Sequence, residues 1–176
     1  FIVNNTGGSI VAVGGDAFTN SGTGTIAVNG LSTLSGITTL TNTSTSAAAI
    51  NIATGATLSA TTLNSSVGTI TVAGTLEAAT TITGGTLNVL TNGDVGAVQV
   101  TSNGILDVAG GTVASLDLDA GTTQKISDAG EVTGTTTIDN ATLTQSGVSS
   151  KLGTDGTDAS TVTVGSGGVY VANDGI

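Results

Sequence analysis

The amino-acid sequence predicts an all-β fold of the parallel β-solenoid type, in which short strands wind around a core and successive coils stack. Three observations predict it. The chain is rich in Gly and β-branched residues, apolar triplets recur every 17 to 24 residues, and Gly, Asn and Asp separate them. We expect about nine coils of about three strands each, forming one continuous segment over residues 1–176.

The composition excludes a conventional core. The chain has no Cys, His, Met, Pro or Trp, and only 2% of its residues are aromatic and 8% charged. Hydrophobic residues still make up 38%, which argues against disorder, and their regular spacing argues against a flexible linker. Small aliphatic side chains must therefore fill the core, as the narrow interior of a coil allows.

One apolar column organises the repeat. Ile10 begins it, and its further leading positions are Ile26, Ile50, Ile70, Leu87, Leu106, Ile126, Leu143 and Val162. Most repeats have a second apolar residue two positions later, as at Val28, Ile52, Val72, Val89, Val108 and Val164. Alternate side chains of a strand share a face, so each triplet predicts one inward-facing strand per coil. Asp128 and Gln145 break the second column, which predicts bulges or another register there.

Each repeat holds two further apolar clusters, such as Leu76 and Ile82 after Ile70, which predict the other two strands of the coil. Turn residues such as Gly84-Gly85 lie between the strands, where positive φ angles let the chain turn. An antiparallel β-sandwich is the alternative fold, because it also has many short strands with frequent turns. The scarcity of aromatic residues and the abundance of Gly favour the solenoid.

The charge of the chain restricts its partners. Lys125 and Lys151 are the only cationic side chains against 12 carboxylates, so the net charge is −10. This charge repels phosphate polymers and anionic membrane surfaces, and we expect no nucleic-acid partner. No apolar run is long enough to span a membrane as a helix. The chain begins directly in strand-like sequence at Phe1, so we expect it to be part of a longer or processed chain.

The available ligands limit metal binding. Without Cys or His, sites for zinc, copper and haem lack their usual ligands, whereas carboxylate and carbonyl oxygens suit calcium. Turn-like segments at residues 92–94 and 155–158 make Asp94, Asp155 and Asp158 the candidate calcium ligands. Neither segment matches a complete calcium-binding motif. Calcium is the one cofactor that the sequence suggests.

Catalysis is not expected. Asp117 and Asp119 flank Leu118 and should point outward from one strand, as a carboxylate pair acting on a polysaccharide would require. The chain has no Arg or His, however, to stabilise developing charge or to activate a hydroxyl group. A solvated acidic surface is the better interpretation of this pair.

Outward Thr-x-Thr pairs raise an ice-binding hypothesis, because stacked pairs could form a flat, weakly charged array. Three pairs carry it: Thr69/Thr71, Thr142/Thr144 and Thr161/Thr163. In the expected register two other pairs interrupt the array: Ile105/Asp107 and Lys125/Ser127. Threonine as an ordinary strand former is therefore the better interpretation, and binding of ice or carbohydrate is kept as an alternative function.

Two segments carry a resemblance to a known class of protein. Residues 68–76, Gly-Thr-Ile-Thr-Val-Ala-Gly-Thr-Leu, and residues 81–89, Thr-Ile-Thr-Gly-Gly-Thr-Leu-Asn-Val, resemble the repeats of autotransporter-type passengers and large bacterial surface antigens. The resemblance implies a right-handed β-helix exported to the bacterial cell surface.

From this resemblance and the composition we expect an extracellular structural rod, as a filament, a surface layer or an adhesin. Its expected partners are neighbouring repeats, other copies stacked end to end, and a host or cell-surface ligand.

Overall fold

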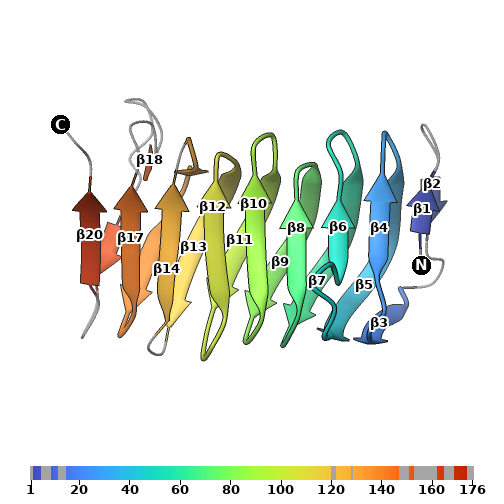
Figure 1. Cartoon of the computed structure of the whole chain (residues 1–176), viewed down its shortest axis with the longest axis horizontal. Helices are drawn as coiled ribbons and strands as arrows, with labels where there is room; N and C mark the ends of the chain where they lie inside the picture. Colours follow the sequence, from blue (N-terminus) through green and yellow to red (C-terminus); the bar gives the residue numbers. More distant parts are fainter. Residues whose placement is uncertain are drawn as a thin grey trace.

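The computed structural model describes residues 2–4, 9–11, 15–119, 122–127, 129–146, 151–152, 162–164 and 169–173. It shows an all-β parallel solenoid of about seven turns with two parallel sheets. The strands of successive turns lie side by side along the long axis (Figure 1). Every pair of strands in the described part is parallel, so the solenoid prediction is confirmed and the antiparallel sandwich is ruled out. The expected hand of the coil and the expected number of coils are not confirmed.

The first sheet takes one short strand from each coil. In spatial order it contains β1 (Ile2–Asn4), β4 (Ile26–Asn29), β6 (Ile50–Ile52), β8 (Thr69–Val72), β10 (Thr86–Leu90), β12 (Ile105–Ala109), β14 (Thr123–Ser127), β17 (Thr142–Ser146) and β20 (Val169–Asn173). The apolar-x-apolar triplets form these strands, because the two apolar side chains face the core while the residue between them faces outward.

The second sheet takes the rest of each coil. Its central strands are long: β5 (Thr33–Ser44), β7 (Thr57–Ser65), β9 (Thr75–Ile82), β11 (Asp94–Val100) and β13 (Thr112–Asp119). Shorter strands complete it at the two ends: β2 (Ser9–Val11), β3 (Ala17–Gly22), β15 (Glu131–Val132), β16 (Thr136–Asp139), β18 (Lys151–Leu152) and β19 (Val162–Val164).

The central coils therefore contain two strands where three were expected. Each long strand covers both expected positions, and the pairing register shifts between Leu34 and Ile37 in β5, and between Val95 and Val98 in β11. Such irregularities bend a strand without ending it. In the coil after β14, by contrast, β15 and β16 are separate strands.

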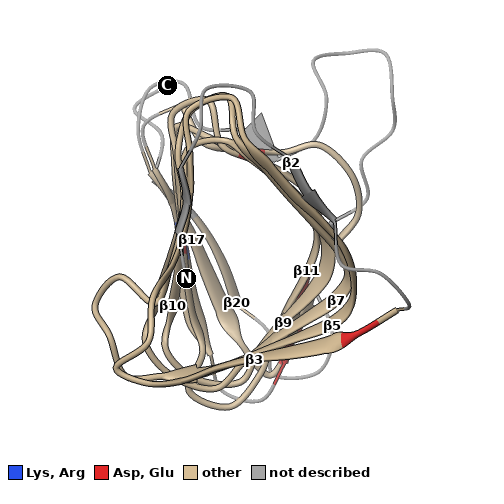
Figure 2. Ribbon diagram, turned by 90° about the vertical axis from the view of Figure 1, so that its right-hand side faces the viewer, with Lys and Arg blue, Asp and Glu red and all other residues tan. Residues whose placement is uncertain are grey.

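Inward side chains of the two sheets fill one apolar core. Figure 2, a view along the rod, shows β10, β17 and β20 across the interior from β7 and β11. Ile50, Ile70 and Leu87 of the first sheet are fully buried, as are Leu58 and Leu63 of the second. The predicted column of leading residues is confirmed from Ile26 to Leu106, where each lies beside its counterpart in the next coil.

The column continues differently after Leu106. Val108 pairs with Ile126, so Ile126 occupies the second inward position of β14 and Gln124 the leading one. The prediction that Ile126 leads this repeat was wrong, because the inward residue here is a buried amide rather than an apolar side chain. Gln145 does occupy the second column, beside Ile126. Asp128 lies outside the described residues.

Two other members of the predicted column belong to the second sheet. Ile10 pairs with Leu34, and Val162 pairs with Thr136. Both sheets contain apolar-x-apolar triplets, so spacing alone does not assign a triplet to its sheet. The first-sheet column instead passes from Leu143 to Tyr170.

Candidate functional site

The two sheets present different charges on their outer faces. The second sheet carries most of the strand carboxylates in the described part: Glu77, Asp94, Asp117, Asp119, Glu131 and Asp139. The strands of the first sheet carry one carboxylate, Asp107, and one cation, Lys125. One side of the rod is therefore acidic, whereas the outer face of the first sheet has no net charge.

Asp94 is the one calcium candidate that lies in the described part of the chain. Asp94 begins β11 with an exposed side chain, and its strand neighbours are Thr75 and Thr112. Across the described residues, no group of three or more acidic side chains is arranged to hold a metal ion. Asp155 and Asp158 lie outside the described residues, so calcium binding stays a prediction.

Three carboxylates gather on the acidic face where β13 meets β16. Asp117 and Asp119 point outward on either side of buried Leu118, as expected, and Asp139 pairs with Asp119 in the next coil. Gln99 of β11 joins the pair, because its Nε2 donates to Asp117 Oδ2 at 3.3 Å and to Asp119 Oδ2 at 3.2 Å. Sequence spacing could not identify Gln99, since only the stacking register places it beside Asp117.

The surroundings of Asp117 favour its protonated form. Partial burial raises the pKa of Asp117 above 3.8, the negative charges of Asp119 and Asp139 raise it further, and the hydrogen bond from Gln99 opposes the shift. The hydrogen-bond donor beside Asp117 is the neutral amide of Gln99, and not a cation.

A shallow hollow of about 310 Å³ adjoins Asp117, lined by Ala79, Thr80, Thr81, Ala97, Val98, Gln99 and Ser115. The expectation that the chain is not an enzyme stays a prediction.

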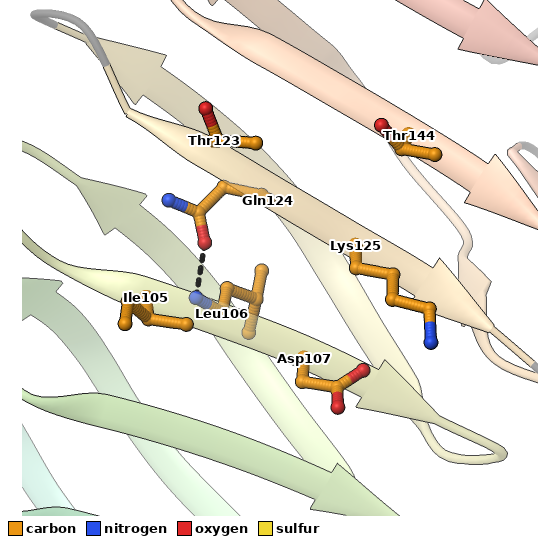
Figure 3. A pocket seen from close by; sticks show the side chains of 7 residues that line it. All are labelled: Ile105, Leu106, Asp107, Thr123, Gln124, Lys125 and Thr144. Atoms are coloured by element: carbon orange, nitrogen blue, oxygen red, sulfur yellow. Dashed lines mark hydrogen bonds between the residues drawn. The ribbon is translucent and has the colours of Figure 1, made fainter.

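A second hollow, of about 350 Å³, lies on the outer face of the first sheet between β12 and β14. Its lining consists of Ile105, Leu106, Asp107, Thr123, Gln124, Lys125 and Thr144 (Figure 3). Ile105 is 49% exposed, which is unusual for an apolar side chain of this size in the described strands. The hollow combines an apolar surface with two hydroxyl groups, a carboxylate and an ammonium group.

Gln124 explains why the sheet opens at this point. The backbone pairing of β12 with β14 begins at Asp107 and Lys125, whereas β12 pairs with β10 from Ile105 onward. In the gap, Gln124 Nε2 donates to the carbonyl oxygen of Gly104 at 2.9 Å, and its Oε1 accepts the Leu106 N–H. The buried side-chain amide thus replaces the missing backbone hydrogen bonds.

The register also changes the threonine columns. Lys125 pairs with Asp107 and Thr123 pairs with Thr142, so β14 presents Thr123/Lys125 rather than the expected Lys125/Ser127. Thr163 lies on β19 of the second sheet, and Thr161 lies outside the described residues. The first sheet thus has Thr69, Thr86, Ile105, Thr123 and Thr142 in one outward column.

Comparison with family models, curated proteins and solved structures gives no match to this chain. In the described part of the chain, no helix has the length and hydropathy that a membrane span needs. The fold is a β-solenoid.

Proposed function

We propose that this chain is a segment of an extracellular bacterial surface protein and acts as a structural rod in a filament, a surface layer or an adhesin. One observation carries the proposal. The two sheets continue strand by strand from β4 to β13, and one apolar core follows them. A structure built from stacked nearest neighbours extends by adding coils, which suits a spacer more than a compact catalytic domain.

The acidic face supports a role at an exposed surface. Glu77, Asp94 and Asp117 point outward from strands of the second sheet. Carboxylates distributed along a sheet keep it soluble and discourage lateral pairing of the stacked strands. Divalent cations would reduce this repulsion, so we expect calcium to promote lateral association of the rods.

End-to-end association is part of the proposal. β20 follows β17 at one end of the first sheet, with Val169 47% exposed and Tyr170 37% exposed. An open strand edge with apolar side chains can pair with a following coil or with another copy. Negative-stain imaging with and without calcium tests this arrangement. Filaments or sheets are the expected result, and isolated particles at every concentration, with or without calcium, would contradict it.

The location is tested separately. Antibody labelling of intact cells of the source organism should detect the protein, since a surface rod is accessible without lysis. Labelling that requires permeabilised cells would reject the extracellular role but leave the fold unaffected.

The second candidate function is binding of ice or carbohydrate by the outer face of the first sheet. The observed register favours it more than the sequence did, because Thr123 joins Thr86 and Thr142 in one column. Shaping of growing ice crystals by the purified protein would support ice binding.

A further inference from the structure

We propose that the outer face of the first sheet binds an uncharged polysaccharide, with one sugar unit seated in the hollow between β12 and β14. This inference rests on the second candidate function and gives the rod a ligand-binding role in addition to the proposed structural one.

The hollow has the mixed chemistry that a sugar unit requires. Ile105 supplies an apolar surface for the C–H face of a sugar ring. Figure 3 shows the side chains of Asp107 and Lys125 near each other on the neighbouring strands β12 and β14, farther along β12 than Ile105. The carboxylate accepts hydrogen bonds from sugar hydroxyl groups, and the ammonium group of Lys125 donates them. A volume of about 350 Å³ is at the lower end of small-molecule sites, which fits one ring.

Gln124 makes the hollow a constructed feature. The same inward position holds Ile70, Leu87 and Leu106 in preceding coils, where the backbone ladder is closed. The amide of Gln124 lies where the backbone pairing of β12 with β14 is missing, and both its nitrogen and its oxygen are hydrogen-bonded to the backbone of β12 and the residue before it. Proteins depart from a regular repeat mainly at functional sites. We therefore interpret the replacement of the usual apolar residue by Gln124 as part of a binding site.

The charge distribution selects an uncharged ligand. Asp107 and Lys125 are the charged side chains on the described strands of the first sheet, and they balance each other. The chain as a whole carries −10, so an acidic polysaccharide meets repulsion at long range, and the balanced pair in the hollow gives it no net attraction there. An uncharged chain of sugars meets no such repulsion.

The threonine columns extend the surface on both sides of the hollow. Outward side chains on β8 and β10 continue it in one direction and those on β17 in the other: Thr69, Thr71, Thr86, Asn88, Thr142 and Thr144. Hydroxyl and amide groups along the rod can hydrogen-bond successive sugar units, so weak contacts at several units add up. Ice fits this face less well, because the hollow and the charged pair interrupt its flatness.

The test is a titration of the ¹⁵N-labelled chain with three neutral trisaccharides, cellotriose, maltotriose and triacetylchitotriose, and with tri-galacturonate, followed by amide chemical shifts. We expect at least one neutral trisaccharide to shift the amides of Ile105, Lys125 and Thr144 with millimolar affinity, and tri-galacturonate to bind more weakly. Amides of the acidic face, such as that of Glu77, should not move.

Two variants restore the regular pattern of the repeat. Ile105→Thr gives β12 the residue of its column neighbours, and Gln124→Leu gives β14 the usual inward residue, which should close the hollow. Each should weaken trisaccharide binding by about fivefold or more. Even a tenfold change in affinity corresponds to only a small loss of apolar contact, so losing the Ile105 surface or the hollow is enough to produce this effect. Glu77→Gln on the opposite sheet is the matched control and should bind as the original chain does.

Ile105→Thr keeps the test decisive if Gln124→Leu fails to fold, because residue 105 is outside the core. The proposal is overturned if no neutral trisaccharide binds at its solubility limit, if tri-galacturonate binds as tightly, or if Ile105→Thr binds unchanged. Dimerisation that Ile105→Thr abolishes, measured by sedimentation, would assign the face to a second copy instead. Ice shaping without trisaccharide binding would assign it to ice.

Discussion

Asn20 and Asn42 lie one above the other in adjacent coils, and Asn20 Nδ2 donates a hydrogen bond to Asn42 Oδ1 at 3.0 Å. Both side chains are buried. The same column continues through Ser65 to Ile82 and Val100, so one end of the described core is polar and the middle is apolar. A polar column is stable in such a core only when each amide is hydrogen-bonded.

Asn42→Ala should therefore lower the free energy of unfolding by about 2–3 kcal/mol. Asn42 Nδ2 donates to Ser65 Oγ at 3.0 Å and to the Val67 carbonyl oxygen at 2.8 Å, so the substitution removes three hydrogen bonds of a buried amide, including the one from Asn20. Urea unfolding followed by circular dichroism measures the change. Thr41→Val, on the outward side of the same strand, should stay within about 0.5 kcal/mol of the original chain. Equal effects of the two substitutions would show that the asparagine column contributes little.

Thr136→Val should stabilise the chain by about 1 kcal/mol. Thr136 is 1% exposed, and its hydroxyl group has no hydrogen-bond partner in the described structure. Valine has nearly the same shape and fits a column that contains Leu116 in the preceding coil. The urea midpoint should rise for Thr136→Val and stay nearly constant for Thr137→Val, whose side chain points outward. A lower midpoint for Thr136→Val would mean that the hydroxyl group has a stabilising partner.

The sequence was sufficient to predict the parallel solenoid because the spacing of the apolar triplets equals the number of residues in one coil. Ile26, Ile50 and Ile70 are separated by one coil each and stack as expected. The spacing failed at Gln124, because an inward amide is indistinguishable in a sequence from an outward one. Its inward orientation depends on backbone groups of Gly104 and Leu106 that only the stacked structure brings near.

The candidate sites also combine features that one strand determines with features that depend on contacts between coils. Alternation along one strand was enough to place Asp117 and Asp119 on one outer face. Gln99 was not predicted as their partner, because contacts between coils depend on a register that is set by the bends in the long strands. The outward threonine array was identified from the sequence but was interpreted as interrupted by Lys125/Ser127, since Thr123 joins its column only in the observed register.

Asp117→Asn should stabilise the chain at neutral pH and lose this advantage in acid. Burial and the charges of Asp119 and Asp139 raise the pKa of Asp117 above 3.8 in the folded state, so the folded chain binds this proton more tightly than the unfolded chain does. Stability from this group is therefore greatest below pH 3.8 and falls as pH rises through the folded pKa. Asparagine does not ionise, so the variant avoids this loss of stability at higher pH. The difference in urea midpoint between Asp117→Asn and the original chain should be positive at pH 7 and shrink toward zero near pH 3.8, and a constant difference would reject this cause.

Gly85→Ala should cost about 3 kcal/mol or more, because two separate penalties apply at this turn. Gly85 has a φ of +77°, and a Cβ atom placed there would lie 2.3 Å from the carbonyl oxygen of Gly68 in the preceding coil. That oxygen accepts the N–H of Thr86 at 2.8 Å, so relieving the overlap would disturb the start of β10. Gly30→Ala separates the two penalties, since Gly30 has a φ of +60° but open space around the position of a Cβ atom. It should cost only about 1 kcal/mol, the conformational part alone. Thermal or urea unfolding of the two variants compares them directly, and similar losses would mean that the coils can separate at Gly85 to admit a methyl group.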